Sequence, residues 1–288
     1  MKTGKLRDAF EWRDLERVIV LSPHLDDAAL SCGGLLLALR AMGVPRLVVS
    51  VCCGNPPARP SPEGSGKSTQ RRGYVSPRKR RAEDVAAMRM LGSDYVHLGF
   101  ADGVYRRSPL TGELVYRHPR ERWVEPRIDD AAFVEELYLL LRRLCLGLGR
   151  VLLVVPLGIG QHVDHAITGR VALRLAADLQ FLWYEDFPYV IGRGVSPWEG
   201  DHPIQALSRL RRVPVARLAL PFRAARKAAL LECYRTQLSP LFGGTPGMRE
   251  AVGRRTLDGR PCEFYWRARP ASADRGAHIR PPAAREGG

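Results

Sequence analysis

Short apolar runs alternating with helical stretches constrain the fold of this 288-residue chain more than any other feature. The apolar runs predict strands over residues 17–24, 46–53, 95–100, 150–156, 179–185 and 215–220. Between and after them, the spacing of apolar residues predicts helices over 27–42, 78–91, 129–147, 164–178 and 222–236. Alternation of this kind is typical of a parallel sheet that buries both faces under helices. We therefore expect an α/β fold with a mostly parallel sheet flanked by helices.

The charge composition gives only a weak indication of binding partners. The net charge is +15, from 45 basic and 30 acidic residues. Only five of the basic residues are lysine, and so large an excess of arginine is typical of a GC-rich genome. A basic chain attracts anions and nucleic acid non-specifically, but no RNA- or DNA-binding motif is present. We expect no specific nucleic-acid partner.

Three features of the sequence predict a cytoplasmic protein. No window reaches the ~18 uninterrupted apolar residues of a membrane span, so we expect no transmembrane segment. The N-terminal residues 1–17 are polar and charged, without the apolar region of a secretory signal. The six cysteines form no CxxC pair, and most lie in apolar surroundings, as buried reduced thiols do.

The chain is expected to form one domain over residues 1–269, followed by a disordered basic tail rich in Pro, Ala and Arg at 270–288. Two long loops, 55–77 and 101–127, are expected to shape the functional site. The first contains GSGKST, but Ser61 stands where a phosphate-binding loop requires its first glycine. We therefore interpret that stretch as a flexible loop.

Two polar stretches follow apolar runs directly. SPHLDD at 22–27 follows the run at 18–21, and GQHVDH at 160–165 follows the run at 151–155. In open α/β sheets, ligands bind outside the carboxyl ends of the strands, and both stretches fall there. Two adjacent carboxylates, Asp26 and Asp27, repel each other unless a positive charge lies close by. The pattern favours a cation site.

The residue types in these stretches suit a catalytic metal. His24, Asp27 and His165 offer two imidazole nitrogens and a carboxylate, a good three-ligand set for Zn²⁺ that leaves the fourth position for water. Asp26 is then a free carboxylate that can act as general base on such a water. His162 would lie on the rim, where it stabilises or protonates a tetrahedral intermediate.

The remaining polar residue of the second stretch, Asp164, is expected to accept a hydrogen bond from one of the imidazoles and fix its tautomer. A simpler interpretation is that Asp26 only caps the helix that follows, which is worth about 0.5–2 kcal/mol. HxDH at 162–165 is equally compatible with a solvated helix start. The occurrence of both stretches at strand ends favours the metal site.

The sequence resembles a known family at these positions. PHLDD at 23–27 together with HxDH at 162–165 is similar to the PIG-L/LmbE-like zinc-dependent N-deacetylases, which have a Rossmann-like fold. The family's commonest motif has proline where this chain has Leu25 and Val163, and this departure suggests a distinct substrate subgroup. Further similar segments lie at 80–92, 98–103 and 155–165, and those that resemble the glycopeptide-antibiotic sugar deacetylases lie at 184–190 and 227–238.

The resemblance implies a role for each candidate residue. His24, Asp27 and His165 carry over as zinc ligands. Asp26 carries over as the base, and His162 as the group that stabilises the transition state.

On the substrate side, the family's arginine maps to Arg80 or, less securely, to Arg81, with a solvated helix face as the alternative. Asp102 is implied to hold sugar hydroxyls. Glu185 and Asp186 end a strand and either line the pocket or cap it. His97 lies within YVHLGF and is expected to be a packed strand residue.

The sequence therefore predicts a zinc-dependent hydrolase that removes an N-acetyl or N-acyl group from an amino sugar, such as an N-acetylglucosaminyl conjugate. One Zn²⁺ per chain is expected, with another divalent metal such as Fe²⁺ as the alternative, and the partner is a small-molecule or glycoconjugate substrate. Two other functions remain open: an amidase for a small-molecule or thiol conjugate, and a basic nucleic-acid-binding protein on the same fold. The acylated substrate, the oligomeric state and the general acid, either Asp26 or His162, are left open.

Overall fold

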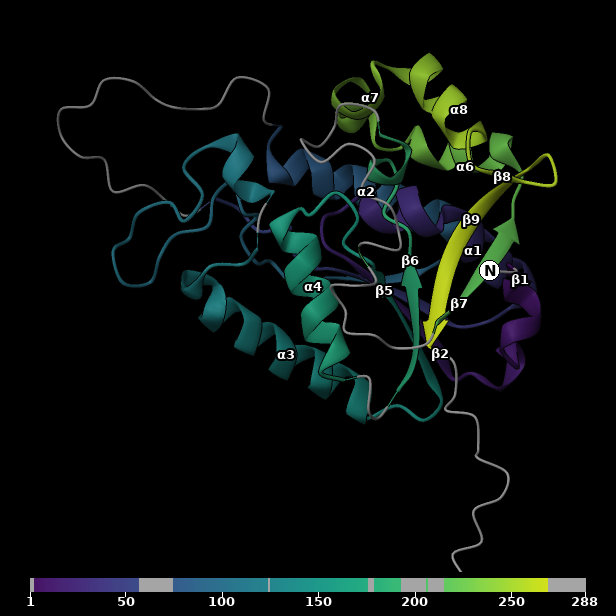
Figure 1. The fold of residues 1–288 in the computed structure, drawn as a ribbon, viewed down its shortest axis with the longest axis horizontal. Coiled ribbons are helices and arrows are strands. Elements are labelled where there is room, and N and C mark those ends of the chain that lie inside the picture. Colours follow the sequence, from purple (N-terminus) through teal and green to yellow (C-terminus); the bar gives the residue numbers. More distant parts are fainter. Residues whose placement is uncertain are drawn as a thin grey trace, which may run out of the picture.

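The computed structural model describes residues 3–56, 75–123, 125–175, 179–192, 206 and 215–268. Its centre is a nine-stranded sheet with the strand order β1-β7-β9-β6-β5-β2-β3-β4, and β8 pairs with β9. Neighbouring strands are parallel except at β9, which runs antiparallel to β6, β7 and β8. The predicted α/β fold with a mostly parallel sheet is confirmed (Figure 1).

The strands are β1 (Gly4–Lys5), β2 (Arg17–Ser22), β3 (Arg46–Ser50), β4 (Asp94–His97), β5 (Val151–Pro156), β6 (Gln180–Tyr184), β7 (Val215–Pro221), β8 (Thr256–Leu257) and β9 (Arg260–Ala268). The α-helices are α1 (Asp27–Met42), α2 (Pro77–Leu91), α3 (Ala131–Leu146), α4 (Val163–Leu173), α6 (Ala224–Leu231), α7 (Arg235–Phe242) and α8 (Thr245–Gly253). Short 3-10 helices are η1 (Leu6–Ala9), η2 (Trp12–Asp14), η3 (Pro119–Arg122), η4 (Ile128–Asp130) and η5 (Tyr189–Ile191).

Successive side chains of the central strands face opposite sides of the sheet, and this divides the core into two layers. In β2, Val18 and Val20 face the cluster formed by α1, α2, α6, α7 and α8, while Ile19 and Leu21 face the cluster formed by α3 and α4. Figure 1 shows α3 and α4 together along one side of the sheet, with α6, α7 and α8 gathered at the other. Because successive side chains of a strand point to opposite faces, uninterrupted apolar runs are buried on both sides.

The carboxyl-terminal part of the fold differs from the prediction. The single helix expected over 222–236 is wrong, since α6 ends at Leu231 and α7 begins at Arg235. Antiparallel β9 was not predicted at all; charged residues interrupt its apolar ones, and its neighbours β6 and β7 are distant in sequence. The predicted helix over 164–178 is described as α4 and ends at Leu173.

A buried carboxylate fastens β9 to α1. The side chain of Glu263 accepts hydrogen bonds from the backbone N–H groups of Gly34 (2.6 Å) and Leu35 (2.9 Å). It also pairs with the buried Lys227 ammonium at 2.6 Å and accepts from the Tyr265 hydroxyl at 2.7 Å. Each buried polar group here has a partner, so the antiparallel strand is held against the helix that begins at the first histidine motif.

Some expectations fall outside the described residues. Residues 57–74, which include GSGKST, and the predicted tail at 270–288 are not described. All six cysteines are described and are free thiols. Among the described helices, none combines the length and apolar character needed to cross a membrane.

Gly34→Ala is expected to destabilise the fold, because a Cβ there would lie 2.9 Å from Phe222 Cβ and 3.0 Å from Glu263 Cδ. Overpacking of this kind costs about 2 kcal/mol, which lowers the melting temperature of a domain of this size by roughly 4–8 °C. The control is Gly147→Ala, where a Cβ meets nothing within 4 Å. Thermal unfolding followed by circular dichroism measures both; equal melting temperatures would contradict the packing described here.

Candidate active site

The two histidine motifs meet because their strands are neighbours in the sheet. β2 pairs with β5 in parallel register, from Arg17 opposite Val151 to Val20 opposite Val154. The strand order also reverses at this point, since β3 and β4 follow on one side and β6 on the other. The crevice outside such a reversal is the usual ligand site of an open α/β sheet.

Asp26 does not cap α1, contrary to the simpler interpretation of its sequence. Its side chain makes no capping hydrogen bond, and Ser22 Oγ accepts the N–H of Ala28 instead, at 2.9 Å. Asp26 Oδ1 is paired with Arg80 Nη2 at 2.8 Å. The buried carboxylate is therefore oriented by an arginine from α2.

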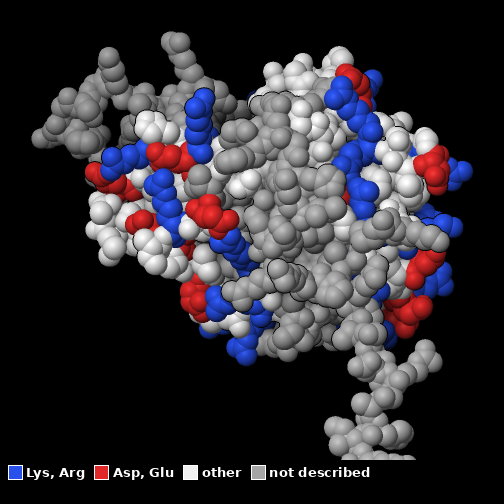
Figure 2. All heavy atoms as spheres, in the orientation of Figure 1, with Lys and Arg blue, Asp and Glu red and all other residues white. Residues whose placement is uncertain are grey.

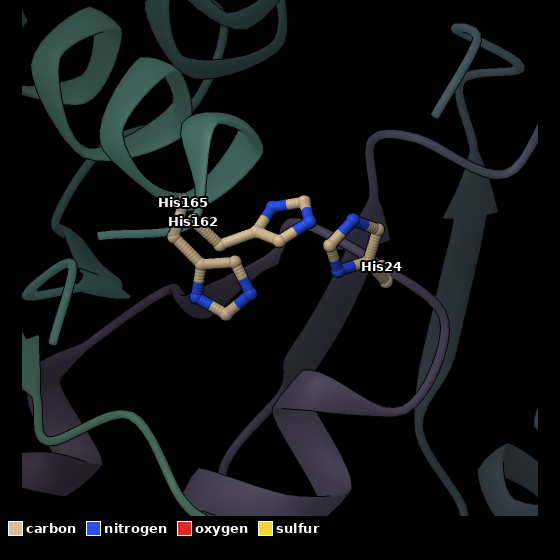
Figure 3. A group of neighbouring side chains, drawn as sticks. All are labelled: His24, His162 and His165. Atoms are coloured by element: carbon tan, nitrogen blue, oxygen red, sulfur yellow. The ribbon is translucent and has the colours of Figure 1, made fainter. Parts of the chain in front are cut away.

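One oxygen of Asp27 joins the two motifs. Asp27 Oδ2 accepts the backbone N–H of His24 at 2.8 Å and lies 3.1 Å from His24 Nδ1 and 3.2 Å from His165 Nε2. All three side chains are buried. Figure 3 shows His162 and His165 extending from the start of α4 toward His24 on the loop after β2. The three predicted metal ligands are thus brought together.

In His24 and His165, the ring nitrogen that does not contact Asp27, here called the outer nitrogen, is held by a further carboxylate. His24 Nε2 lies 3.0 Å from Asp164 Oδ2, and His165 Nδ1 lies 2.7 Å from Asp186 Oδ1. A carboxylate on the outer nitrogen directs the lone pair of the inner nitrogen into the site, as it does in metal-binding histidines. Asp164 therefore has the orienting contact expected from the sequence, and Asp186 is a second group of the same kind.

The donor geometry fits a divalent metal. His165 Nε2 is buried, and its 3.2 Å contact with Asp27 Oδ2 lacks the geometry of a hydrogen bond. Around a tetrahedral Zn²⁺ with bonds of about 2.0–2.1 Å, neighbouring donors lie about 3.3 Å apart. The separations of 3.1 and 3.2 Å from Asp27 Oδ2 are close to that value. His24, Asp27 and His165 could therefore hold Zn²⁺ or a similar cation.

Among the described residues, two groups of side chains have donor atoms that all lie within 4.8 Å of one another, and neither group contains Asp27. The three histidines, His24, His162 and His165, form one group, and His24, Asp102 and Asp164 form the other. In the second group, Asp164 is already bound to Arg106 and to the N–H of Gly103. The first group shares two members with the set around Asp27, so both indicate the same place.

The negative charges of the cluster require a balancing positive charge. Burial opposes it, but His165 and His24 hold the pKa of Asp27 well below its usual value. Against the same opposition by burial, Asp27 and Asp186 raise the pKa of His165 to about 9, and Asp164 and Asp27 raise that of His24. Protons on the imidazoles therefore balance the carboxylates, and a metal ion takes their place when it binds.

His162 is set up as a neutral hydrogen-bond donor. It is the N-cap residue of α4, and its Nδ1 accepts the N–H of Asp164 at 3.3 Å, which leaves the hydrogen on Nε2. Burial, followed by the positive His24, lowers the pKa of His162 well below its usual value. Its ring lies edge-on to His24 at 4.8 Å. The structure thus favours neutral His162 over the protonated form suggested by the sequence.

Two aromatic residues that the sequence did not indicate pack against these histidines. Trp123 lies edge-on to His162 with ring centroids 4.9 Å apart, and Tyr189 lies 5.4 Å from His165. Trp123 and Tyr189 also contact each other at 5.5 Å. Gly160 permits this packing, because a Cβ there would lie 2.9 Å from Tyr189 Cβ. These rings form an apolar wall beside the site, here called the aromatic wall.

Two of the predicted substrate residues lie beside the cluster. Arg80 and Asp102, with Leu25 and Tyr105, line a small open pocket. Asp102 Oδ2 lies 3.8 Å from His24 Nε2.

The alternative arginine has a different role. Arg81 bonds to the carbonyl of Cys53 at 2.6 Å and to Asn55 Oδ1 at 2.9 Å. Arg80 is therefore the arginine that faces the site.

Glu185 is not brought to the cluster. Its carboxylate accepts hydrogen bonds from Arg217, Arg255 and Trp266, and it lines a separate small pocket. Successive side chains leave the end of β6 in opposite directions, so Asp186 reaches His165 where Glu185 was expected to reach the substrate.

His97 lies outside the cluster as expected. Its Nε2 is 2.7 Å from Asp84 Oδ2, and Asp84 also accepts from the Tyr234 hydroxyl.

Comparison with known proteins finds relatives that align with most of the chain. A family model described as PIG-L, GlcNAc-PI de-N-acetylase, matches residues 19–176, which include both histidine motifs. A 2'-N-acetylparomamine deacetylase of Niallia circulans is 27% identical and aligns with 80% of this chain and 84% of its own length. The protein of the same name from Streptomyces fradiae is 28% identical, with 89% and 91% aligned.

Solved structures share the fold. The zinc-inhibited form of teicoplanin deacetylase Orf2 superposes with a TM-score of 0.70 at 23% identity, covering 89% of this chain and 99% of that one. The A40926 pseudoaglycone deacetylase Dbv21 gives a TM-score of 0.63 at 23% identity, covering 88% and 97%.

Asp186→Asn is expected to weaken Zn²⁺ binding about 10- to 100-fold, because the outer nitrogen of His165 loses its carboxylate. The control is Asp84→Asn, which removes a carboxylate from His97 at the same 2.7 Å distance but away from the cluster. Competition with a chromophoric chelator measures both affinities. Equal weakening in the two variants would show that the loss is not specific to this site.

Proposed function

Because the chain belongs to the PIG-L family of GlcNAc-PI de-N-acetylases, we propose that it removes the N-acetyl group from an amino sugar. Membership makes it a hydrolase of amide C–N bonds. The observation that carries the proposal is the convergence of His24, Asp27 and His165 beside Asp26, a carboxylate with no role as a helix cap. The substrate we favour is an N-acetylated sugar of an antibiotic-like glycoconjugate, since relatives are named for N-acetylparomamine and structural neighbours for glycopeptides.

His24, Asp27 and His165 would hold one Zn²⁺ per chain, or another divalent metal such as Fe²⁺. When bound, a metal of this kind lowers the pKa of water to about 7 and polarises a carbonyl. The orienting contacts of Asp164 and Asp186 support this assignment because they direct one nitrogen of each imidazole inward.

Asp26 is the proposed general base. Arg80 holds one of its oxygens, which fixes the carboxylate next to Asp27. Burial raises the pKa of Asp26 while Arg80 opposes that rise, and a stronger base results than an exposed carboxylate provides. Asp26 accepts the proton of the water that attacks the acetyl carbon. Asp26 or His162 then delivers a proton to the leaving nitrogen as the C–N bond breaks, which yields acetate and a free amine.

His162 is proposed to stabilise the negative charge that develops on the acetyl oxygen. Its Nε2–H is the available donor because Nδ1 already accepts the N–H of Asp164. A preorganised donor in a buried site needs no rearrangement as charge develops, which makes it effective in catalysis.

The surroundings of the cluster suggest where the sugar and the acetyl group of the substrate bind. Arg80 and Asp102 line the open pocket beside His24 and are proposed to bind sugar hydroxyls. The aromatic wall contacts His162 and His165 instead and is proposed to face the acetyl methyl group. Apolar rings next to the reacting carbonyl would limit the length of the acyl chain.

The nucleic-acid-binding alternative gains no support from the described residues on the face shown in Figure 2. In Figure 2, basic and acidic side chains are interspersed on the face shown. Arg170 in α4 is paired with Glu125, and Arg174, just after the helix, is paired with Glu135 at 2.8 Å. A binding surface for nucleic acid requires unneutralised positive charge in a stripe or patch.

Asp26→Asn is expected to lower kcat/KM about 10²- to 10⁴-fold and to leave Zn²⁺ affinity unchanged, since a general base is lost and no ligand is. Acetate release from N-acetylated amino sugars, including 2'-N-acetylparomamine, measures the rate, and chelator treatment of wild type should abolish it. The control is Asp94→Asn, an exposed carboxylate on β4. Full activity in Asp26→Asn would remove Asp26 from the mechanism.

Trp123→Ala is expected to relax acyl-chain selectivity. The ratio of kcat/KM for an N-butyryl sugar to that for its N-acetyl counterpart should rise at least about tenfold, because one methylene is worth 10-fold or more in an apolar pocket. The control is Tyr95→Ala, a partly exposed ring on β4 away from the cluster. A uniform fall for all chain lengths would place the sugar, not the acyl group, against the aromatic wall.

A further inference from the structure

A buried arginine lies between two buried carboxylates behind the site. Arg106 is 6% exposed, and Asp130 and Asp164 are fully buried. Arg106 Nη1 donates to Asp130 Oδ1 at 2.8 Å, and Nη2 donates to Asp164 Oδ1. The guanidinium also lies over the ring of Phe133 at 4.6 Å. Arginine is suited to such a place because its planar fork binds two carboxylates with fixed geometry.

One end of this triad reaches a predicted metal ligand. Arg106 holds one oxygen of Asp164, and the other oxygen, Oδ2, contacts His24 Nε2 at 3.0 Å. Oδ2 also accepts the N–H of Gly103 at 3.0 Å. Both oxygens are thus fixed, so the direction in which the His24 ring points depends on where Arg106 holds the carboxylate.

The other end of the triad fastens the segment 101–130, here called the site loop. Asp130 Oδ2 accepts the Tyr116 hydroxyl and the N–H of Arg127, the latter at 2.9 Å. Arg127 in turn donates to the carbonyl of Val115 at 2.5 Å. The contacts of Arg106 therefore tie the fold of the site loop to the position of His24.

Stability alone is a weak reason for such a triad. Removing two or three charges from water costs several kcal/mol each, and well-packed apolar replacements are often equally stable. Control of the orientation of a metal ligand is a stronger reason, because mutation of residues that hydrogen-bond to a metal ligand typically changes metal affinity 10- to 100-fold.

We propose that Arg106 is a positioning residue that couples the order of the site loop to metal affinity at His24. The coupling is reciprocal: a loop held in place strengthens metal binding, and a bound metal protects the loop from opening. The inference rests on the proposed function only in requiring a metal at His24, and it does not depend on the identity of the substrate.

The test compares Arg106→Met, which keeps the side chain's apolar bulk, with Arg106→Lys and with the adjacent control Arg107→Met. Arg107 is exposed and donates to the carbonyl of Gly112 within the same loop. Chelator competition gives Zn²⁺ affinity, and hydrogen–deuterium exchange with and without Zn²⁺ gives the protection of residues 101–130.

Arg106→Met should bind Zn²⁺ about 10- to 100-fold more weakly, and Zn²⁺ should no longer slow exchange in the site loop as it does in wild type. Arg106→Lys should retain part of the Zn²⁺ affinity and part of the Zn²⁺-linked protection, because it keeps the positive charge but lacks the planar guanidinium. Arg107→Met should match wild type in both measurements. If Arg106→Met does not fold, Asp130→Asn, which weakens the same anchor, should shift both readouts in the same direction.

Unchanged Zn²⁺ affinity in Arg106→Met, or exchange that rises equally with and without Zn²⁺, would overturn the proposal and leave Arg106 a structural residue. Failure of wild type to bind Zn²⁺ would overturn it as well. Zn²⁺-linked protection in a wild-type protein that releases no acetate from N-acetylated sugars would support this proposal and contradict the proposed function.

Discussion

The contact of one Asp27 oxygen with the inner nitrogens of His24 and His165 is the interaction on which the rest of the site depends. Three ionisable groups lie within hydrogen-bond distance of one point in a buried place. Such a cluster is stable only if positive charge is shared among its members, either as protons or as a metal ion. The sheet makes the contact possible, because β2 and β5 are paired and end at the same edge.

Around that contact, the charged groups next to the cluster are oriented by partners from different parts of the fold. Arg80 comes from α2, Asp186 from the end of β6, and Arg106 from the site loop. Long-range packing therefore sets the positions of the bases and ligands, and each partner removes rotational freedom from the group it holds. Preorganisation of this kind is what distinguishes a catalytic metal site from an incidental group of donors.

The sequence predicted the main parallel strands and the meeting of His24, Asp27 and His165, because both follow local rules, but it did not predict antiparallel β9. Apolar runs followed by helices predict parallel strands, and polar residues at the ends of such strands must meet at one edge. The sequence placed Asp186 at a strand end without assigning its contact to His165, and it did not indicate Arg106, Trp123 or Tyr189. Their roles depend on which side chains the tertiary fold brings together. Glu185 and Asp186 are adjacent in sequence, but Asp186 contacts His165 while Glu185 contacts Trp266 away from the cluster.

The most direct test of the account is an anomalous diffraction experiment at the zinc edge on crystals grown with one equivalent of Zn²⁺. The account predicts a single strong peak about 2.0–2.2 Å from His24 Nδ1, Asp27 and His165 Nε2, with Asp26 and His162 beside it but not bound. A peak among His24, Asp102 and Asp164 instead, or no peak near His165, would contradict it.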